Sequence, residues 1–177
     1  MPGASTRTEE RRAQIVRAPS HPVIPENKVT IFLAGTTSGA DWRGTVACAL
    51  SHFPVAVLDP LRPDWDALWR EEDDADDPMA APFREQVEWE LDMQKRADLI
   101  AFYFGPGTDA PVSLLELGLC AWRSVVVVVV ACHREYKKRG NVQIVCRRLG
   151  LDFVDGGEDA LVRRVVERVD GLLGDDK

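Results

Sequence analysis

Short apolar runs alternate along the chain with longer segments in which apolar residues recur every three or four positions. The apolar runs occupy residues 29–34, 55–58, 99–104 and 125–130, with a shorter one at 152–154. Unbroken runs of this length are typical of parallel strands that are covered on both faces. The six consecutive valines at 125–130 are the clearest case, because β-branched side chains favour strands over helices.

The segments between these runs have helical spacing. They cover residues 42–53, 82–97, 113–122, 141–149 and 159–173. Strands that alternate with helices predict an α/β fold, a doubly wound, mostly parallel five-stranded sheet in a single domain. Two further segments have weaker patterns: we expect a short turn of helix at 64–69 and an exposed acidic loop at 71–77.

The N-terminal segment differs from the rest of the chain. Residues 1–27 are rich in Ser, Thr, Arg and Pro and lack apolar periodicity, so we expect a disordered tail there and a domain over residues 28–174. The longest apolar run is about half of what a bilayer crossing needs, and no hydrophobic signal core is present. We therefore expect a cytoplasmic protein that has no contact with a membrane.

Charge and cysteine usage narrow the function classes. The formal net charge of the 177-residue chain is −7 and its basic residues are dispersed, which argues against nucleic acid as a partner. The four cysteines form no C-x-x-C pair and have no zinc-type spacing with histidine. Clustered acids without a glycine turn rarely bind a metal tightly. We expect neither a metal nor a cofactor.

One acidic residue stands out against its apolar surroundings. The predicted strand at 99–104 ends in a Gly/Pro loop, and the helix that follows contains Glu116, the only charged residue between Asp109 and Arg123. Open α/β sheets bind ligands at the carboxyl ends of their strands. A carboxylate among leucines is costly to keep ionised without a partner. We interpret Glu116 as the nucleophile or charge stabiliser of a small-molecule site.

A second acid is expected at the same edge of the sheet. Gln86 and Glu90 are four residues apart and share one face of a predicted helix. Two carboxylates at one pocket can divide the work, one meeting positive charge on a sugar carbon and the other handling a proton. Spacing alone leaves open the alternative that Glu90 is a surface acid and Glu116 pairs locally.

The loop after the first predicted strand offers further binding groups. Residues 34–39 lack the third glycine of the dinucleotide fingerprint, yet Thr36 and the backbone amides at the start of the helix can receive a phosphate or a sugar hydroxyl. A phosphate would need a cation, for which Arg43 and Arg62 are the candidates.

Several motifs in order resemble those of the nucleoside 2-deoxyribosyltransferase family, over residues 31 to about 155. The motifs are IFLAG at 31–35, DPLRPDW at 59–65, EQVEWEL at 85–91, AD at 97–98, SLLELG at 113–118, Tyr136, and RGNV at 139–142. The resemblance implies a flavodoxin-like fold. It also implies cleavage of the N-glycosidic bond of a 2-deoxyribonucleoside or its 5′-phosphate, with transfer to another nucleobase or to water.

The resemblance also implies roles for individual residues. Glu116 matches the glutamate that attacks the anomeric carbon, and Glu90 matches the acid that holds or protonates the nucleobase. Asn141 matches an asparagine that reaches a neighbouring subunit's site, which implies a homodimer or a higher homo-oligomer. The remaining substrate contacts expected are Gln86 at the base, Trp42 as an apolar wall, and Gly35 and Thr36 at the sugar end.

The chain departs from the family pattern at two positions. Asp109 lies one position away from an aspartate that transferases commonly have, and it is our candidate for that substrate-binding role. The strand at 29–34 has Phe32, which carries no hydroxyl, where transferases have a tyrosine that orients the nucleophile. Losing that hydrogen bond weakens the case for transfer. A non-catalytic module that binds a nucleoside or nucleotide therefore remains the alternative.

Overall fold

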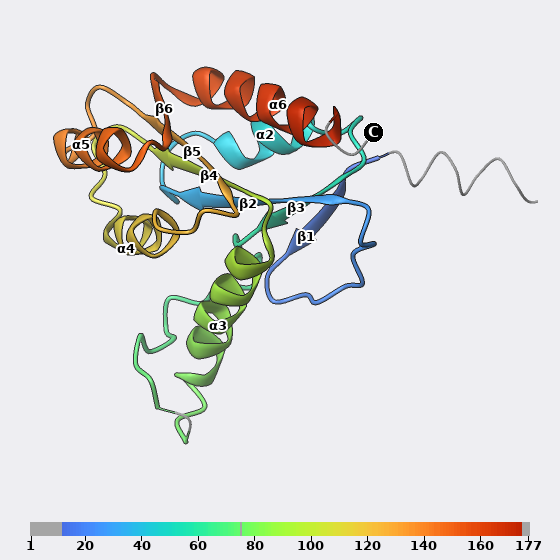
Figure 1. The fold of residues 1–177 in the computed structure, drawn as a ribbon. Coiled ribbons are helices and arrows are strands. Elements are labelled where there is room, and N and C mark those ends of the chain that lie inside the picture. The colour runs from blue at the N-terminus through green and yellow to red at the C-terminus, as the bar shows by residue number, and fades with distance from the viewer. Residues whose placement is uncertain (1–11, 75, 175–177) are drawn as a thin grey trace, which may run out of the picture.

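A computed structural model describes residues 12–74 and 76–174. Its strands form one sheet in the order β1-β3-β2-β4-β5-β6, with every neighbouring pair parallel (Figure 1). The strands are β1 (Gln14–Arg17), β2 (Val29–Gly35), β3 (Val55–Asp59), β4 (Leu99–Phe104), β5 (Val127–Cys132) and β6 (Asp152–Asp155). The helices are α2 (Trp42–Ala49), α3 (Ala81–Arg96), α4 (Pro111–Cys120), α5 (Arg139–Leu149) and α6 (Glu158–Gly174). The predicted α/β fold with a parallel sheet is confirmed.

The predicted number of strands is wrong, because β1 adds a sixth. This strand lies within the segment predicted as a tail, so the expected start of order at residue 28 is also wrong. Only Val16 of β1 is buried, and Ile15 pairs with Val57 at the sheet edge. Four residues with one buried side chain leave no periodic pattern, and pairing with β3 supplies the missing stabilisation. The part of the tail prediction that concerns residues 1–11 lies outside the described residues.

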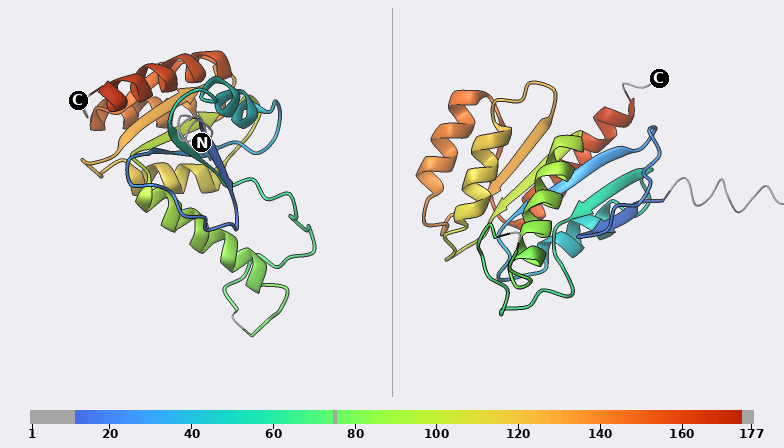
Figure 2. Two further views of the ribbon diagram at one scale, coloured as in Figure 1. Left: turned by 90° about the vertical axis from the view of Figure 1, so that its right-hand side faces the viewer. Right: turned by 90° about the horizontal axis from the view of Figure 1, so that it is seen from below.

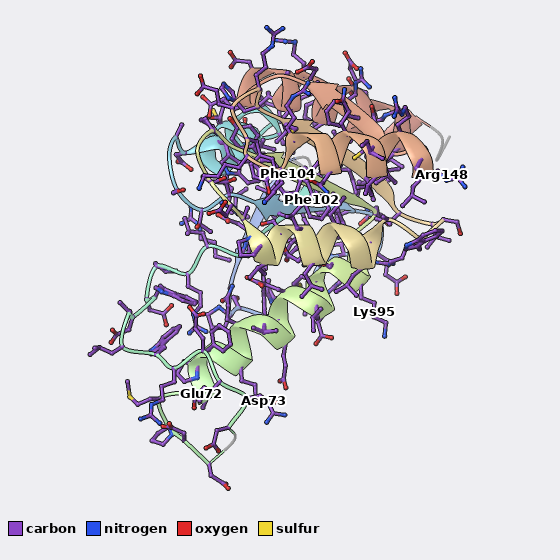
Figure 3. The ribbon with its side chains drawn as sticks, turned by 90° about the vertical axis from the view of Figure 1, so that its left-hand side faces the viewer. Glu72, Asp73, Lys95, Phe102, Phe104 and Arg148 are labelled. Carbon is purple, nitrogen blue, oxygen red and sulfur yellow. The ribbon has the colours of Figure 1, made fainter. Side chains whose placement is uncertain are left out.

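Two loop predictions have different outcomes. Residues 64–69 form turns and no helix, so the predicted helical turn is wrong. The acidic loop is exposed as predicted at residues 71–74 and 76. Glu72 and Asp73 lie beside the start of α3, away from the sheet (Figure 3). No described helix combines the length and apolar character that a membrane crossing requires.

Helices cover both faces of the sheet (Figure 2). Helices α2 and α6 pack on one face, where Trp42 and Leu161 join Ile31 and Leu33 in a hydrophobic core. Helices α3, α4 and α5 pack on the other face, over a second core. Its members include Phe32, Trp89, Phe102, Phe104, Leu117 and Val142. Alternate residues of each strand thus serve opposite cores, which explains why the strands read as unbroken apolar runs.

The strand order reverses between β2 and β4. From β2 the chain crosses to β3 on one side and then returns to β4 on the other side. The carboxyl ends of β2 and β4 are tied closely, because the N–H of Thr36 donates to the carbonyl of Tyr103 at 2.9 Å. Gly35 makes this approach possible with a φ of 132°. Loops that diverge above such a point leave room for a ligand.

Candidate functional site

A cavity of about 400 Å³ opens at this carboxyl edge, between the ends of β2 and β3 and the helices α3 and α4. Glu90 and Glu116, the two acids predicted to work together, both line it. Gly35 and Gln86 line it too, as do Arg43 and several apolar side chains. The apolar part of the wall consists of Ala34, Pro60, Leu61, Trp65, Phe83, Val87 and Val112. The carboxyl groups of Glu90 and Glu116 therefore share one largely apolar pocket, and the exposed Glu71 also lines it.

Glu116 is buried and held by a neighbour from the adjacent helix. Its side chain is 9% exposed, and Gln94 Nε2 on α3 donates a hydrogen bond to Glu116 Oε1. Sequence reasoning missed Gln94. The signal was present, because Gln86, Glu90 and Gln94 are spaced four residues apart and form one polar stripe on α3. The side chain of Glu116 is thus held by Gln94 of α3 and by no hydroxyl from Phe32 of β2.

Burial perturbs both carboxyl groups. It raises the pKa of Glu116 to about 8, the negative charge of Glu90 acts in the same direction, and the Gln94 hydrogen bond and Arg43 oppose the rise. Burial also raises the pKa of Glu90, against the hydrogen bond from Gln86 and the charge of Arg43. Near neutral pH the pair therefore retains a proton, which is the condition for one acid and one base at a single site.

Arg43 supplies a positive charge that acts on both acids, and its hydrogen bonds hold the loop after β2. Its Nη1 donates to the Thr36 carbonyl and its Nη2 to the Gly35 carbonyl, both at 2.9 Å. It also lies 3.8 Å from Asp59 and stacks over Trp42. These contacts occupy the guanidinium, so Arg43 is poorly placed to receive a phosphate. Arg62 is similarly engaged, by Asp64 and Glu85 at 2.8 Å each.

Gln86 presents an unpaired acceptor at the cavity. Its Nε2 donates to the Pro60 carbonyl at 2.8 Å and to Glu90 Oε1 at 2.7 Å. Its Oε1 is buried and has no hydrogen-bond partner among the described residues. Buried polar atoms are almost always paired, so this oxygen can accept from an N–H group of a ligand.

A second cavity of about 390 Å³ adjoins the first through shared lining residues at the start of α4. Thr36 and Asp109 line this second cavity and not the first. The Thr36 hydroxyl accepts from the Gly105 N–H at 2.9 Å, and Asp109 pairs with Lys137 at 3.0 Å. The hydroxyl side chains around it are those of Thr36, Thr37, Ser38, Thr108 and Ser113. This composition suits the hydroxyl end of a sugar.

Two predicted contacts lie elsewhere. Trp42, the first residue of α2, is buried in the core between α2 and the sheet and lines neither cavity. Its Nε1 donates to the Thr36 carbonyl at 2.8 Å and so supports the loop after β2. Asn141 is exposed in the first turn of α5 and also lines neither cavity. Its predicted role depends on a second subunit. No described group of three or more His, Cys, Asp or Glu side chains is arranged to hold a metal ion.

The raised pKa of Glu116 predicts a measurable effect on stability. An unfolded chain loses this proton near the ordinary value of 4.5, whereas the native chain keeps it to about pH 8. The contribution of Glu116 to the free energy of unfolding is therefore fully present below about pH 4.5 and is lost as the pH rises through about 8. Glu116→Gln removes this loss and should stabilise the protein by roughly 2–4 kcal/mol at about pH 9, with little effect at about pH 4.

Urea unfolding of both proteins at the two pH values measures this difference. Glu88→Gln is the matched control, because Glu88 is exposed on the same helix as Glu90 and its ion pair with Arg84 contributes little. Equal pH dependence of wild type and Glu116→Gln would show that Glu116 titrates normally.

The chain also matches a known family over most of this site. The family model described as nucleoside 2-deoxyribosyltransferase like matches residues 28–136. The match spans β2 through α4 and β5, so it includes every residue named above as lining the first cavity. No curated protein matches the chain.

Proposed function

The chain belongs to the nucleoside 2-deoxyribosyltransferase-like family, and we propose that it is an enzyme that cleaves the N-glycosidic bond of a 2-deoxyribonucleoside. The substrate class includes the 5′-phosphate, and the sugar passes to another nucleobase or to water. The observation that carries the proposal is the pair Glu116 and Glu90 in one apolar cavity, with Glu116 oriented by Gln94.

Glu116 is the proposed nucleophile. A carboxylate oxygen of Glu116 attacks the anomeric carbon while the bond from that carbon to the base nitrogen breaks, and the bonding electron pair leaves with the base. In the reactive state the proton that the two acids share lies on Glu90, so that Glu116 is ionised, and Glu90 donates this proton to the departing base. The product of this step is a deoxyribosyl ester of Glu116 and a free nucleobase.

The second step resolves the ester. The nitrogen of an incoming base, or a water oxygen, attacks the anomeric carbon, and Glu116 leaves as a carboxylate. Glu90 accepts the proton that the incoming nucleophile loses, so both acids return to their starting state. The unpaired Oε1 of Gln86 accepts from the N–H groups of the base, and the hydroxyl-rich second cavity receives the sugar end.

We also propose that the active form is a homo-oligomer. Apolar side chains are exposed on α3 and α4 around the mouth of the first cavity, where Val87 and Val112 are 37% and 60% exposed. The same two helices expose Leu91, Leu115 and Leu119, and Trp122 follows α4 directly. Exposed apolar surface of this kind favours association. The cytoplasmic location and the absence of a nucleic-acid partner stay predictions from sequence.

Product analysis tests the proposed function. Wild-type protein is incubated with each 2-deoxyribonucleoside and its 5′-phosphate, with and without a second base, and the products are separated by chromatography. Free base without exchange identifies a hydrolase, and an exchanged nucleoside identifies a transferase. Glu90→Gln should lower the rate roughly 10²- to 10³-fold, since it removes the general acid, whereas Glu88→Gln should leave it unchanged.

One outcome favours the alternative function. A binding module on the same fold would be stabilised by a nucleoside against thermal unfolding and yet release no base from any substrate. The buried Phe32, which has no hydroxyl to orient Glu116, is the observation that favours this alternative.

A further inference from the structure

A larger cavity lies on the other face of the sheet. It has a volume of about 590 Å³ and opens between the ends of β4, β5 and β6 and the start of α6. None of its lining residues lines the Glu116 cavity. Neither the family match nor the proposed reaction gives this space a role, and α6 lies beyond the matched residues. We call it the α6 cavity.

The Tyr103 hydroxyl is an unpaired polar group at the α6 cavity. The side chain extends from β4, is 8% exposed, and packs its ring against Trp42 with the centroids 5.5 Å apart. The hydroxyl lies 3.9 Å from the position that a Cβ would take at Gly157, so it faces the segment before α6. No described residue forms a hydrogen bond with it. The hydroxyl itself is not among the buried atoms, so it faces the cavity and is free to bond with a ligand there.

Two further groups converge on the same space. Glu158 Oε2 is buried and has no partner among the described residues. Burial raises the pKa of the Tyr103 phenol, and the nearby negative charge of Glu158 raises this pKa further. His133 Nδ1 accepts from the Glu135 N–H at 3.2 Å, so the neutral ring has its hydrogen on Nε2. The Cδ2 atom next to Nε2 lies 3.9 Å from the same Cβ position at Gly157.

The charges around the α6 cavity argue against an anion. The N-terminus of a long helix attracts phosphate groups. Here, however, three acids line the cavity: Asp155, Glu158 and Asp159. Arg139 pairs with Asp155 at 2.8 Å, and Arg163 is the only arginine or lysine among the described lining residues. A phosphate would lie among more negative than positive charges.

The free groups instead match hydroxyls. Glu158 Oε2 only accepts, His133 Nε2 donates, and the Tyr103 hydroxyl does either. A ligand hydroxyl also donates and accepts, and it carries no charge that the acids would repel. We propose that the α6 cavity is a second ligand site that binds the adjacent hydroxyls of a sugar, supplied as a free pentose or as the ribose of a ribonucleoside. This site does not depend on the proposed reaction at Glu116.

Residue-resolved NMR tests the proposal. Amide shifts of ¹⁵N-labelled full-length protein are followed during separate titrations with ribose, adenosine and inorganic phosphate, up to tens of millimolar. Ribose or adenosine should shift the amides of Gly39, Gly156, Gly157 and Ala160, all at the α6 cavity. Shifts with ribose identify a free sugar as sufficient, and shifts with adenosine alone identify a glycoside. Shifts at these amides with phosphate alone, or with no ligand, would overturn the proposal.

Two variants separate a specific site from a general effect. Tyr103→Phe removes only the hydroxyl and should weaken binding about fivefold, because one hydrogen bond to a neutral group contributes about 1 kcal/mol. Gly157→Leu fills the space between Tyr103 and His133 and should abolish the shifts at Gly39. Glu90→Gln, in the other cavity, should leave the affinity unchanged. Wild-type affinity in Tyr103→Phe would show that the hydroxyl is not an anchor and would refute the site as described, even if Gly157→Leu did not fold.

Discussion

Glu116→Gln is expected to lower kcat/KM for base release from a 2-deoxyribonucleoside roughly 10⁴- to 10⁶-fold, since loss of a nucleophile can cost an enzyme about 10⁶ in rate. The amide has nearly the shape of the carboxyl group, and its oxygen can still accept from Gln94 Nε2. An amide oxygen does not form the glycosyl ester that the carboxylate forms, so the first step has no nucleophile. Because the same change should stabilise the protein above neutral pH, lost activity cannot be attributed to unfolding.

A direct signature accompanies the rate. Wild-type protein quenched during turnover should gain the mass of one deoxyribosyl group, on the peptide that contains Glu116. Neither Glu116→Gln nor unreacted wild type should show this adduct, while Glu88→Gln should show it at the wild-type level. If Glu116→Gln released base at the wild-type rate, Glu116 would not be the nucleophile, and the proposed mechanism would be wrong.

Gly35→Ala is expected to cost more than about 4 kcal/mol in the free energy of unfolding, or to prevent folding. A Cβ at residue 35 would lie 2.2 Å from the Tyr103 carbonyl oxygen and 2.7 Å from its nitrogen, both backbone atoms in the neighbouring strand. The φ of 132° at Gly35 adds strain for any L side chain. The ends of β2 and β4 would have to move apart, which would break the hydrogen bond from the Thr36 N–H to the Tyr103 carbonyl.

Gly39→Ala separates the two causes. Gly39 also has a positive φ, of 100°, but no atom lies within 4 Å of the position that its Cβ would take. The free energy of unfolding of this variant should fall only by the cost of backbone strain, about 1–3 kcal/mol. Urea unfolding of the three proteins measures both differences. If Gly35→Ala were no less stable than Gly39→Ala, the ends of β2 and β4 could not lie as close together as the structure has them.

Much of the candidate site follows from local sequence patterns. The run at 99–104, the loop after it and the single acid in the next helix place Glu116 at the carboxyl end of a central strand. The four-residue spacing of Gln86 and Glu90 places both on one face of α3. The structure brings all three side chains to one cavity, as the sequence predicted.

Other parts of the site depended on distant contacts. The hydrogen-bond donor to Glu116 is Gln94, which comes from another helix, and the positive charge that acts on both acids is that of Arg43. Asp109 and Thr36 lie in the adjoining cavity, and Trp42 lies behind the loop. The direction in which a loop or a helix presents its side chains is set by the neighbouring element on which it packs, which no local pattern records.

The sequence by itself determined the alternation of strands and helices, the burial of the central strands and the place of Glu116 after a central strand, because hydrophobic periodicity and helix spacing are properties of neighbouring residues. The tertiary structure decided the edge strand β1, the partners of Glu116 and the α6 cavity. Each of these arises where segments far apart in the chain meet, and there the pairing of buried polar groups depends on geometry that only the folded chain provides.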